Sequence, residues 1–203
     1  KVISAFSMND VAESAAVNFV SGECRILSLP DLSVTEEYDL SYMPFVTMSR
    51  LSNDKKFLAI GTKKTAANVV QLENCNVYIY DLVNKAFFRR LPSNNADFVS
   101  LDFNAKSSRV LVGANNTLSV DFFDFTKMEY FMPPDGIITD FIYAPDGKTI
   151  ASSSADGTNT ICVSRVLLGE ICEMKGSFTI EKPIAELQNF AFEPKFIDTE
   201  NPM

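Results

Sequence analysis

The residues able to do chemistry are few, and the missing types are as informative as those present. The chain has 203 residues, no His, no Trp and four cysteines, Cys24, Cys75, Cys162 and Cys172. Without His, a Ser-His-Asp triad, a His general base and an imidazole zinc site are excluded. No two cysteines are spaced as C-x-x-C. We therefore interpret all four as small apolar side chains in strands of a reducing compartment.

Asp121 and Asp124, in the run VDFFDF, are a candidate carboxylate pair. Side chains alternate along a strand, so residues three apart face opposite sides and cannot act on one substrate. The phenylalanines of this run are interpreted as core residues. The eight glycines stand at turns or strand ends and form no phosphate-binding loop. We predict no catalytic, cofactor-binding or metal-binding residue, and no cofactor.

Charge is distributed unevenly along the chain. The net charge is −8, which argues against a dedicated nucleic-acid binder. Residues 53–90 hold seven basic and three acidic residues, so this segment carries +4 and the rest of the chain −12. One interpretation is a contact surface for an acidic partner or a phosphate backbone, using Lys63, Lys64, Arg89 and Arg90. The favoured alternative is ordinary solvated charge, which also protects an outer strand from edge-to-edge pairing.

A lengthened connection, KKTAANVVQLENC, occupies residues 63–75. Long loops on a rigid scaffold often carry contacts. Val69, Val70 and Leu72 are therefore candidates for an apolar partner anchor. The alternative is a simple extension of the strand hairpin beyond the sheet.

Most of the chain is predicted to be strand. Short runs rich in Val, Ile, Phe, Tyr and Thr alternate with turn signals such as Asp-Gly and Asn-Asp. Examples are Val2–Phe6, Phe57–Ile60, Val77–Leu82, Val110–Gly113, Leu118–Phe125 and Ile161–Val166. No apolar run is long enough to span a bilayer, and the N-terminus lacks the layout of a signal peptide. We expect an intracellular protein, cytoplasmic or nuclear, with no membrane contact.

The strands repeat with a period of roughly 40 to 50 residues. Each unit opens with an apolar strand that ends near a polar turn, followed by a strand ending in a small residue, an apolar-aromatic strand and a less regular fourth. The openings stand at 2–10, 45–54, 98–107, 137–147 and 185–195. An all-β fold of four-stranded units follows from this pattern.

The pattern resembles the WD-repeat β-propeller family. Ala144–Val166, APDGKTIASSSADGTNTICVSRV, is similar to a family repeat of the form SPDGKxIASxSxDGTIxIWDV. Tyr80-Asp81 stands where the family usually has Trp-Asp, and Phe123-Asp124 is assigned that place in the third unit. Leu27-Ser28 and Ser164-Arg165 take it in the first and fourth units. The family's Trp-Ser/Thr-His-Asp network cannot form here, so apolar packing between blades must replace it.

The resemblance implies a WD-repeat-type propeller of about four four-stranded blades plus the first strand of a fifth. The expected blades span residues 2–43, 44–96, 97–136 and 137–183, with a further blade starting in 184–203. Since the chain opens on one first strand and closes just after another, we expect a consecutive part of a longer propeller.

The resemblance also implies a non-catalytic scaffold, a subunit of a large intracellular assembly such as those of ribosome assembly. The expected partners are other protein subunits, with nucleic-acid contact limited to the basic second blade. Two alternatives stay open. One is a propeller enzyme of the lactonase or dehydrogenase type, and the other is a module that reads short peptides.

Overall fold

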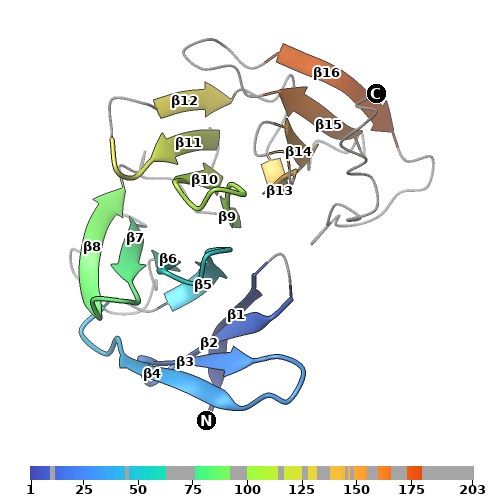
Figure 1. The fold of residues 1–203 in the computed structure, drawn as a ribbon. Coiled ribbons are helices and arrows are strands. Elements are labelled where there is room, and N and C mark those ends of the chain that lie inside the picture. The colour runs from blue at the N-terminus through green and yellow to red at the C-terminus, as the bar shows by residue number, and fades with distance from the viewer. Residues whose placement is uncertain are drawn as a thin grey trace, which may run out of the picture.

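A computed structural model shows an all-β chain (Figure 1). The described residues are 1–9, 12–43, 46–62, 76–91, 100–113, 117–124, 128–131, 138–144, 146, 149–154, 160–165 and 173–179. Within them, every regular element is a strand. No helix in this part of the chain is long and apolar enough to cross a membrane.

The strands form four antiparallel sheets, each with its four strands in chain order. The first sheet contains β1 (Ile3–Met8), β2 (Ser14–Phe19), β3 (Glu23–Ser28) and β4 (Val34–Asp39). The second contains β5 (Val46–Leu51), β6 (Phe57–Thr62), β7 (Asn76–Asp81) and β8 (Ala86–Leu91).

The third and fourth sheets repeat this arrangement. The third contains β9 (Ser100–Phe103), β10 (Arg109–Gly113), β11 (Thr117–Asp121) and β12 (Met128–Phe131). The fourth contains β13 (Ile138–Tyr143), β14 (Thr149–Ser154), β15 (Thr160–Arg165) and β16 (Glu173–Thr179). The expected start of a further blade, at 184–203, lies outside the described residues.

The sheets follow one another around a common centre (Figure 1). The first strand of each sheet lies innermost and the fourth outermost. Because each sheet packs its faces against its neighbours, an inner strand is buried on both sides, and all six residues of β6 are buried. This double burial explains why FLAIGT is continuously apolar or small where a half-exposed strand would alternate.

Apolar side chains fill the spaces between successive sheets. Leu58 and Ile60 of the second sheet pack with Ala16 and Cys24 of the first. The second and third sheets, and then the third and fourth, are joined by similar clusters. Fully burying one large apolar side chain stabilises a fold by roughly 1.5–3 kcal/mol, so these clusters can replace the polar network that the sequence lacks.

The same backbone hydrogen bond closes the turn between the first and second strands of every sheet. The first residue of the turn is Asn9, Ser52, Asn104 or Ala144. In each case that residue's amide donates to the carbonyl five residues ahead, at N–O distances of 2.8–3.1 Å. In the third sheet, Asn104 Oδ1 also accepts from the amides of Ser108 and Arg109, at 2.9 and 3.0 Å. Asn9 makes the matching pair of contacts in the first sheet.

The fourth residue of this turn has a left-handed backbone in the first three sheets. Ala12, Lys55 and Ser107 have φ values of 52°, 60° and 54°. The left-handed region costs a non-glycine residue roughly 1–2 kcal/mol. Gly147, the fourth residue counted from Ala144, lies outside the described residues.

The strand ends correct one of the assignments made from sequence. Asp81 lies opposite Phe57, and Asp121 lies opposite Arg109, so Asp121 is the structural equivalent of Asp81. The assignment of Phe123-Asp124 as the third unit's equivalent of Tyr80-Asp81 is therefore wrong. The equivalent pair is Val120-Asp121. The sequence predicts one strand over Leu118–Phe125, but β11 ends at Asp121 and a bend follows.

Both aspartates build the turn that follows their strand. Asp81 Oδ1 accepts from the Asn84 amide at 2.8 Å, and Asp121 Oδ1 accepts from the Asp124 amide at 3.1 Å. Burial acts to raise the pKa of Asp81, but the hydrogen bonds from Asn84 outweigh it, and the pKa lies below its ordinary value. These carboxylates are thus turn-forming acceptors.

The left-handed position predicts a stabilising substitution. Ala12 is exposed, so Ala12→Gly should relieve backbone strain without removing side-chain packing. Glycine also raises the entropy of the unfolded chain, so the net gain should lie between zero and about 1 kcal/mol. Ala12→Val, at the same site, should destabilise by more than about 1 kcal/mol. Urea unfolding measures both, and equal losses for the two variants would contradict the strain argument.

Cys24 is predicted to be inert in the folded chain. Its side chain is fully buried, and burial raises the pKa of the thiol to about 12. Iodoacetamide near pH 8.5, the ordinary thiol pKa, should therefore label Cys24 only after unfolding. Because the folded-state pKa is raised, the associated stability is complete below about pH 8.5 and falls as the pH rises toward 12. Peptide mass spectrometry reads the labelling, and rapid native modification would contradict the burial.

Candidate protein-interaction surface

Of the described residues, Asp102 has the most buried carboxylate that makes polar contacts between sheets. The Asp102 side chain is 4% exposed. Its Oδ1 accepts from Arg50 Nε of the second sheet at 2.7 Å, and its Oδ2 accepts from the Tyr143 amide of the fourth sheet at 2.7 Å. One carboxylate thus joins three sheets, and both oxygens are engaged in structural contacts.

Asp102 belongs to a repeated position, two residues before the first residue of the turn. Ser7 holds that position in the first sheet, and its Oγ accepts from the Leu51 amide at 3.1 Å. Asp102 makes the same contact with Tyr143, which is equivalent to Leu51. Arg50 holds the position in the second sheet, but a guanidinium has no acceptor atom and donates to Asp102 instead. The contact between neighbouring inner strands is therefore kept in the second sheet, but there the side chain is the hydrogen-bond donor instead of the acceptor.

No group of three or more Cys, Asp or Glu side chains among the described residues could hold a metal ion. The Asp121 carboxylate accepts from the amides of Phe123 and Asp124, so it serves the turn.

Two of the sequence candidates, Arg89 and Arg90, lie on β8, the outer strand of the second sheet. Arg89 is opposite Ile79 and Arg90 is opposite Tyr78, so the two guanidinium groups leave opposite faces of the sheet. A register shift lies between these pairs and the next one, Tyr80 with Phe87. Phe88 is the extra residue of this β-bulge, which brings aromatic and basic side chains together on both sides of β8.

Other cations of the basic segment pair with the first sheet. Lys85 Nζ lies 3.1 Å from Glu36 Oε2 and 5.6 Å from the centre of the Tyr38 ring. Lys55 Nζ lies 2.7 Å from Glu13 Oε2. Exposed ion pairs of this kind typically contribute less than about 1 kcal/mol, so they orient neighbouring sheets more than they stabilise them.

Phenylalanines cluster between the second and third sheets. Phe122 is fully buried and lies 5.1 Å from Phe57 and 5.9 Å from Phe103, between ring centres. Phe123 contacts Phe57 and Phe88, both at 5.6 Å, yet remains 50% exposed. The expectation of a core role is confirmed for Phe122, while Phe123 lies at the surface.

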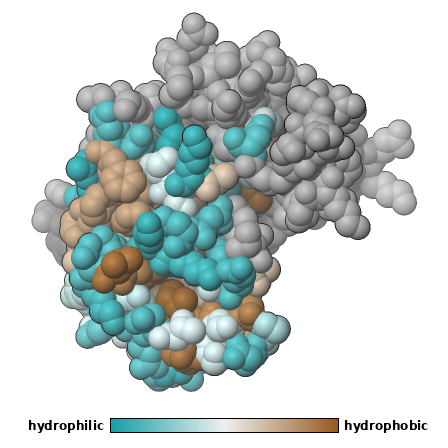
Figure 2. Space-filling view, in the orientation of Figure 1, coloured by the Kyte–Doolittle hydropathy of each residue, from teal (hydrophilic) through white to brown (hydrophobic). Residues whose placement is uncertain are grey.

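The exposed apolar residues continue onto β8. Phe87 is 49% exposed and packs edge-on against Tyr78, with 5.9 Å between ring centres. Arg89 lies 5.7 Å from the centre of the Phe88 ring. Figure 2 shows an apolar area at the outer rim beside β8 and the end of β11, bordered by hydrophilic residues. We call this surface the β8 rim, made of Val83, Phe87, Phe88, Arg89, Arg90 and Phe123.

The sequence pointed to only part of this surface. Arg89 and Arg90 were candidates, but Phe87, Phe88 and Phe123 were missed. The adjacency of two aromatic and two basic residues in AFFRRL is the signal that could have found the first two. Lys63, Lys64, Val69, Val70 and Leu72, the candidates on the lengthened connection, lie outside the described residues.

No family model matches the chain, and no curated protein matches it. Its fold is similar to that of a chain in the solved structure "Crystal Structure of Mitotic Checkpoint Complex", with a TM-score of 0.61 and 18% sequence identity. This likeness and the four four-stranded sheets around one centre decide the architecture. The chain is a partial β-propeller. The match covers 87% of this chain and 51% of the neighbour. The chain therefore spans about half the neighbour's length.

The Asp102 contact predicts a stability difference between buried and exposed ion pairs. Asp102→Ala removes the acceptor that joins three blades and should cost about 3 kcal/mol. Glu36→Ala, the control, removes the exposed pair with Lys85 and should cost less than about 1 kcal/mol. Both are measured by urea unfolding, and similar costs would show that the buried carboxylate has no special role in holding the blades.

Proposed function

We propose that this chain is a divergent WD-repeat-type propeller that acts as a non-catalytic scaffold for protein–protein interaction inside the cell. In this proposal it is a subunit of a large assembly, and its partners are other protein subunits. The fold neighbour comes from a structure described as a complex, which supports a role of this general kind. The particular assembly, for which ribosome assembly is one candidate, is not decided by the fold.

The β8 rim is the observation that carries the proposal. Its aromatic and Arg side chains are the types most enriched at the energetic centres of protein interfaces. The aromatic rings are held by other rings on one side and exposed on the other, so little side-chain freedom would be lost on binding. A partner segment with apolar residues flanked by carboxylates fits this chemistry. A phosphate backbone alone would leave Phe87 and Phe123 without a role.

The structural roles of three aspartate carboxylates support the non-catalytic part of the proposal. Asp102, Asp81 and Asp121 serve blade contacts and turns. The absence of His from the sequence removes the commonest general base. A propeller enzyme of the lactonase or dehydrogenase type remains the alternative. Bound metal together with lactone hydrolysis by the purified protein would establish it.

The scaffold proposal predicts that partners depend on the β8 rim. Phe87→Ser with Arg90→Glu should reduce the amount of co-purifying partner subunits by about tenfold or more, because both side chains are exposed. Lys106→Glu is the control, since it makes the same change of charge as Arg90→Glu at an exposed turn of the third blade. Quantitative mass spectrometry after affinity purification measures partner recovery, and thermal melting checks folding.

An unchanged set of partners in the folded Phe87→Ser, Arg90→Glu variant would remove the β8 rim from the proposal. Equal losses with the Lys106→Glu control would instead indicate a general effect of charge. Neither outcome is expected if the exposed rings and Arg90 form the centre of the contact.

A further inference from the structure

The bulge at Phe88 places two residues of the β8 rim on one side of the strand. Phe87 lies opposite Tyr80 and Arg90 lies opposite Tyr78, and opposite residues of an antiparallel pair share a face. Tyr80 belongs to the cluster between the first and second blades, and Tyr78 packs against it. Phe87 and Arg90 therefore both lie on the side of β8 that faces the first blade. In a regular strand, residues three apart would face opposite sides.

The other side of β8 faces the third blade, and its side chains already contact one another. The Arg89 guanidinium lies 5.7 Å from the centre of the Phe88 ring. Phe88 in turn packs against the cluster between the second and third blades. Phe123, although half exposed, lies 5.6 Å from Phe88 and 4.6 Å from Phe122, between ring centres. The rings and the guanidinium on this side are thus partners of each other.

On the side that faces the first blade, Phe87 and Arg90 have fewer partners. Phe87 is 49% exposed and packs edge-on against the ring of Tyr78. Arg90 is exposed and forms no ion pair within the described residues. This side of the β8 rim therefore presents an exposed ring and an uncompensated guanidinium on one face.

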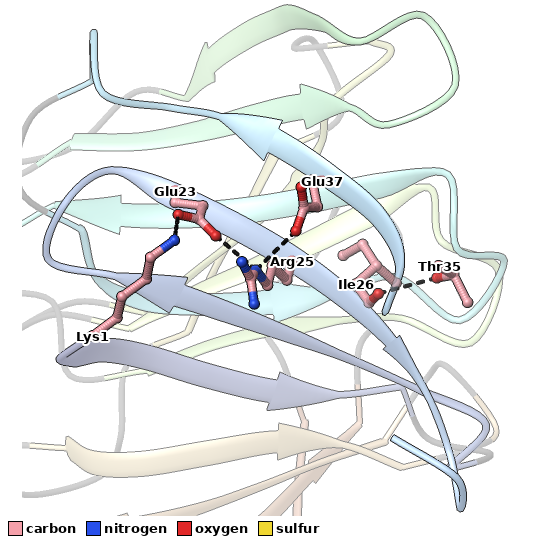
Figure 3. Close-up of polar contacts among 6 residues, drawn as sticks. All are labelled: Lys1, Glu23, Arg25, Ile26, Thr35 and Glu37. Carbon is pink, nitrogen blue, oxygen red and sulfur yellow. Dashed lines mark hydrogen bonds and ion pairs between the residues drawn. The ribbon is translucent and has the colours of Figure 1, made fainter. Parts of the chain in front are cut away.

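The first blade shows how a cation beside a ring is satisfied in this protein. Arg25 lies 5.6 Å from the centre of the Phe19 ring. Its Nε lies 2.6 Å from Glu23 Oε1 of β3 and 3.0 Å from Glu37 Oε1 of β4 (Figure 3). Carboxylates from extended strands thus complete the contact between the ring and the guanidinium.

Lys85, just before β8, has the same combination of partners, and here the contact joins two blades. Its Nζ lies 5.6 Å from the centre of the Tyr38 ring and 3.1 Å from Glu36 Oε2. The Tyr38 hydroxyl donates to the Leu82 carbonyl at 3.1 Å. Glu36 and Tyr38 both belong to β4, so an extended acidic segment already lies against this side of the second blade. Arg90 stands further along the same side.

We propose that the partner protein binds the β8 rim from the side of the first blade, through an extended segment with a carboxylate two positions from a large apolar residue. Residues two apart in an extended chain share a side, so the carboxylate pairs with Arg90 while the apolar side chain packs on Phe87. The uncompensated charge of Arg90 and the continuity with the β4 contact support this occupant. The inference rests on the proposed function and adds the side of β8 and the chemistry of the bound segment.

A second copy of the chain is a less suitable occupant. Its β4 is extended and acidic, but Glu36 is already paired with Lys85 and Glu37 with Arg25. A carboxylate of a separate protein has no such pair to break. The bound segment is therefore assigned to a different protein.

A display library of random peptides, selected on the protein at its native length, tests the inference. Enriched peptides are synthesised with a fluorophore, and fluorescence anisotropy measures their dissociation constants for the wild-type protein and its variants. Arg90→Glu and Phe87→Ser alter the side of β8 that faces the first blade. Arg89→Glu is the matched control, because it makes the same change of charge at the next residue, on the opposite side. Thermal melting confirms that each variant folds.

The enriched peptides should carry Asp or Glu two positions from a large apolar residue. Arg90→Glu and Phe87→Ser should each weaken their binding by about tenfold or more, and Arg89→Glu by less than about threefold. Replacing the carboxylate residue of the peptide with Lys should weaken its binding to the wild-type protein and restore its binding to the Arg90→Glu variant. Such a rescue would place the carboxylate directly on residue 90.

Several results would overturn the inference. These are enriched peptides without a carboxylate, a loss of binding in Arg89→Glu as large as that in Arg90→Glu, no rescue by the exchanged charge, or no enriched peptide at all. The scaffold proposal would still stand if the Phe87→Ser, Arg90→Glu double variant loses its co-purifying partners. Failure of the bound-segment inference and failure of the scaffold proposal are thus distinguishable.

Discussion

The packing of one four-stranded sheet against the next is the constraint on which this structure depends. No blade has a core of its own, because each is a single sheet and buries its faces only against its neighbours. Large aliphatic and aromatic residues fill the spaces between blades, and Asp102 joins three blades through Arg50 and the Tyr143 amide. In a chain without Trp or His, apolar packing and the buried Asp102 carboxylate hold the described blades together.

A second constraint is the geometry of the turn, which different side chains achieve in different blades. Asn9 and Asn104 accept from two backbone amides, whereas Ser52 accepts from the Phe57 amide at 2.9 Å. In three blades a non-glycine residue takes the left-handed backbone at the fourth position of this turn. The same backbone can therefore recur where the sequence repeat is barely visible.

The two surfaces with exposed apolar residues differ in what surrounds them. On the β8 rim, half-exposed rings stand beside Arg89 and Arg90 on the outermost strand of a blade whose faces both meet neighbours. On the first blade, Phe6 and Met8 are exposed on the inner strand β1, at positions that are buried in every other described blade.

The sequence by itself determined the all-β class and the four-stranded repeat, because strand alternation, turn residues and a regular period are local properties. It also placed the strand at residues 57–60 and identified Phe122 as core. It misplaced the third unit's dipeptide, since alternation could not show that the Asp121 carboxylate would end β11 and begin a turn. Only the tertiary structure decided the Arg50–Asp102 contact and the exposure of Phe6, Phe87 and Phe123. These properties depend on which blade lies against which face, and residues 52 positions apart meet only when the blades are stacked.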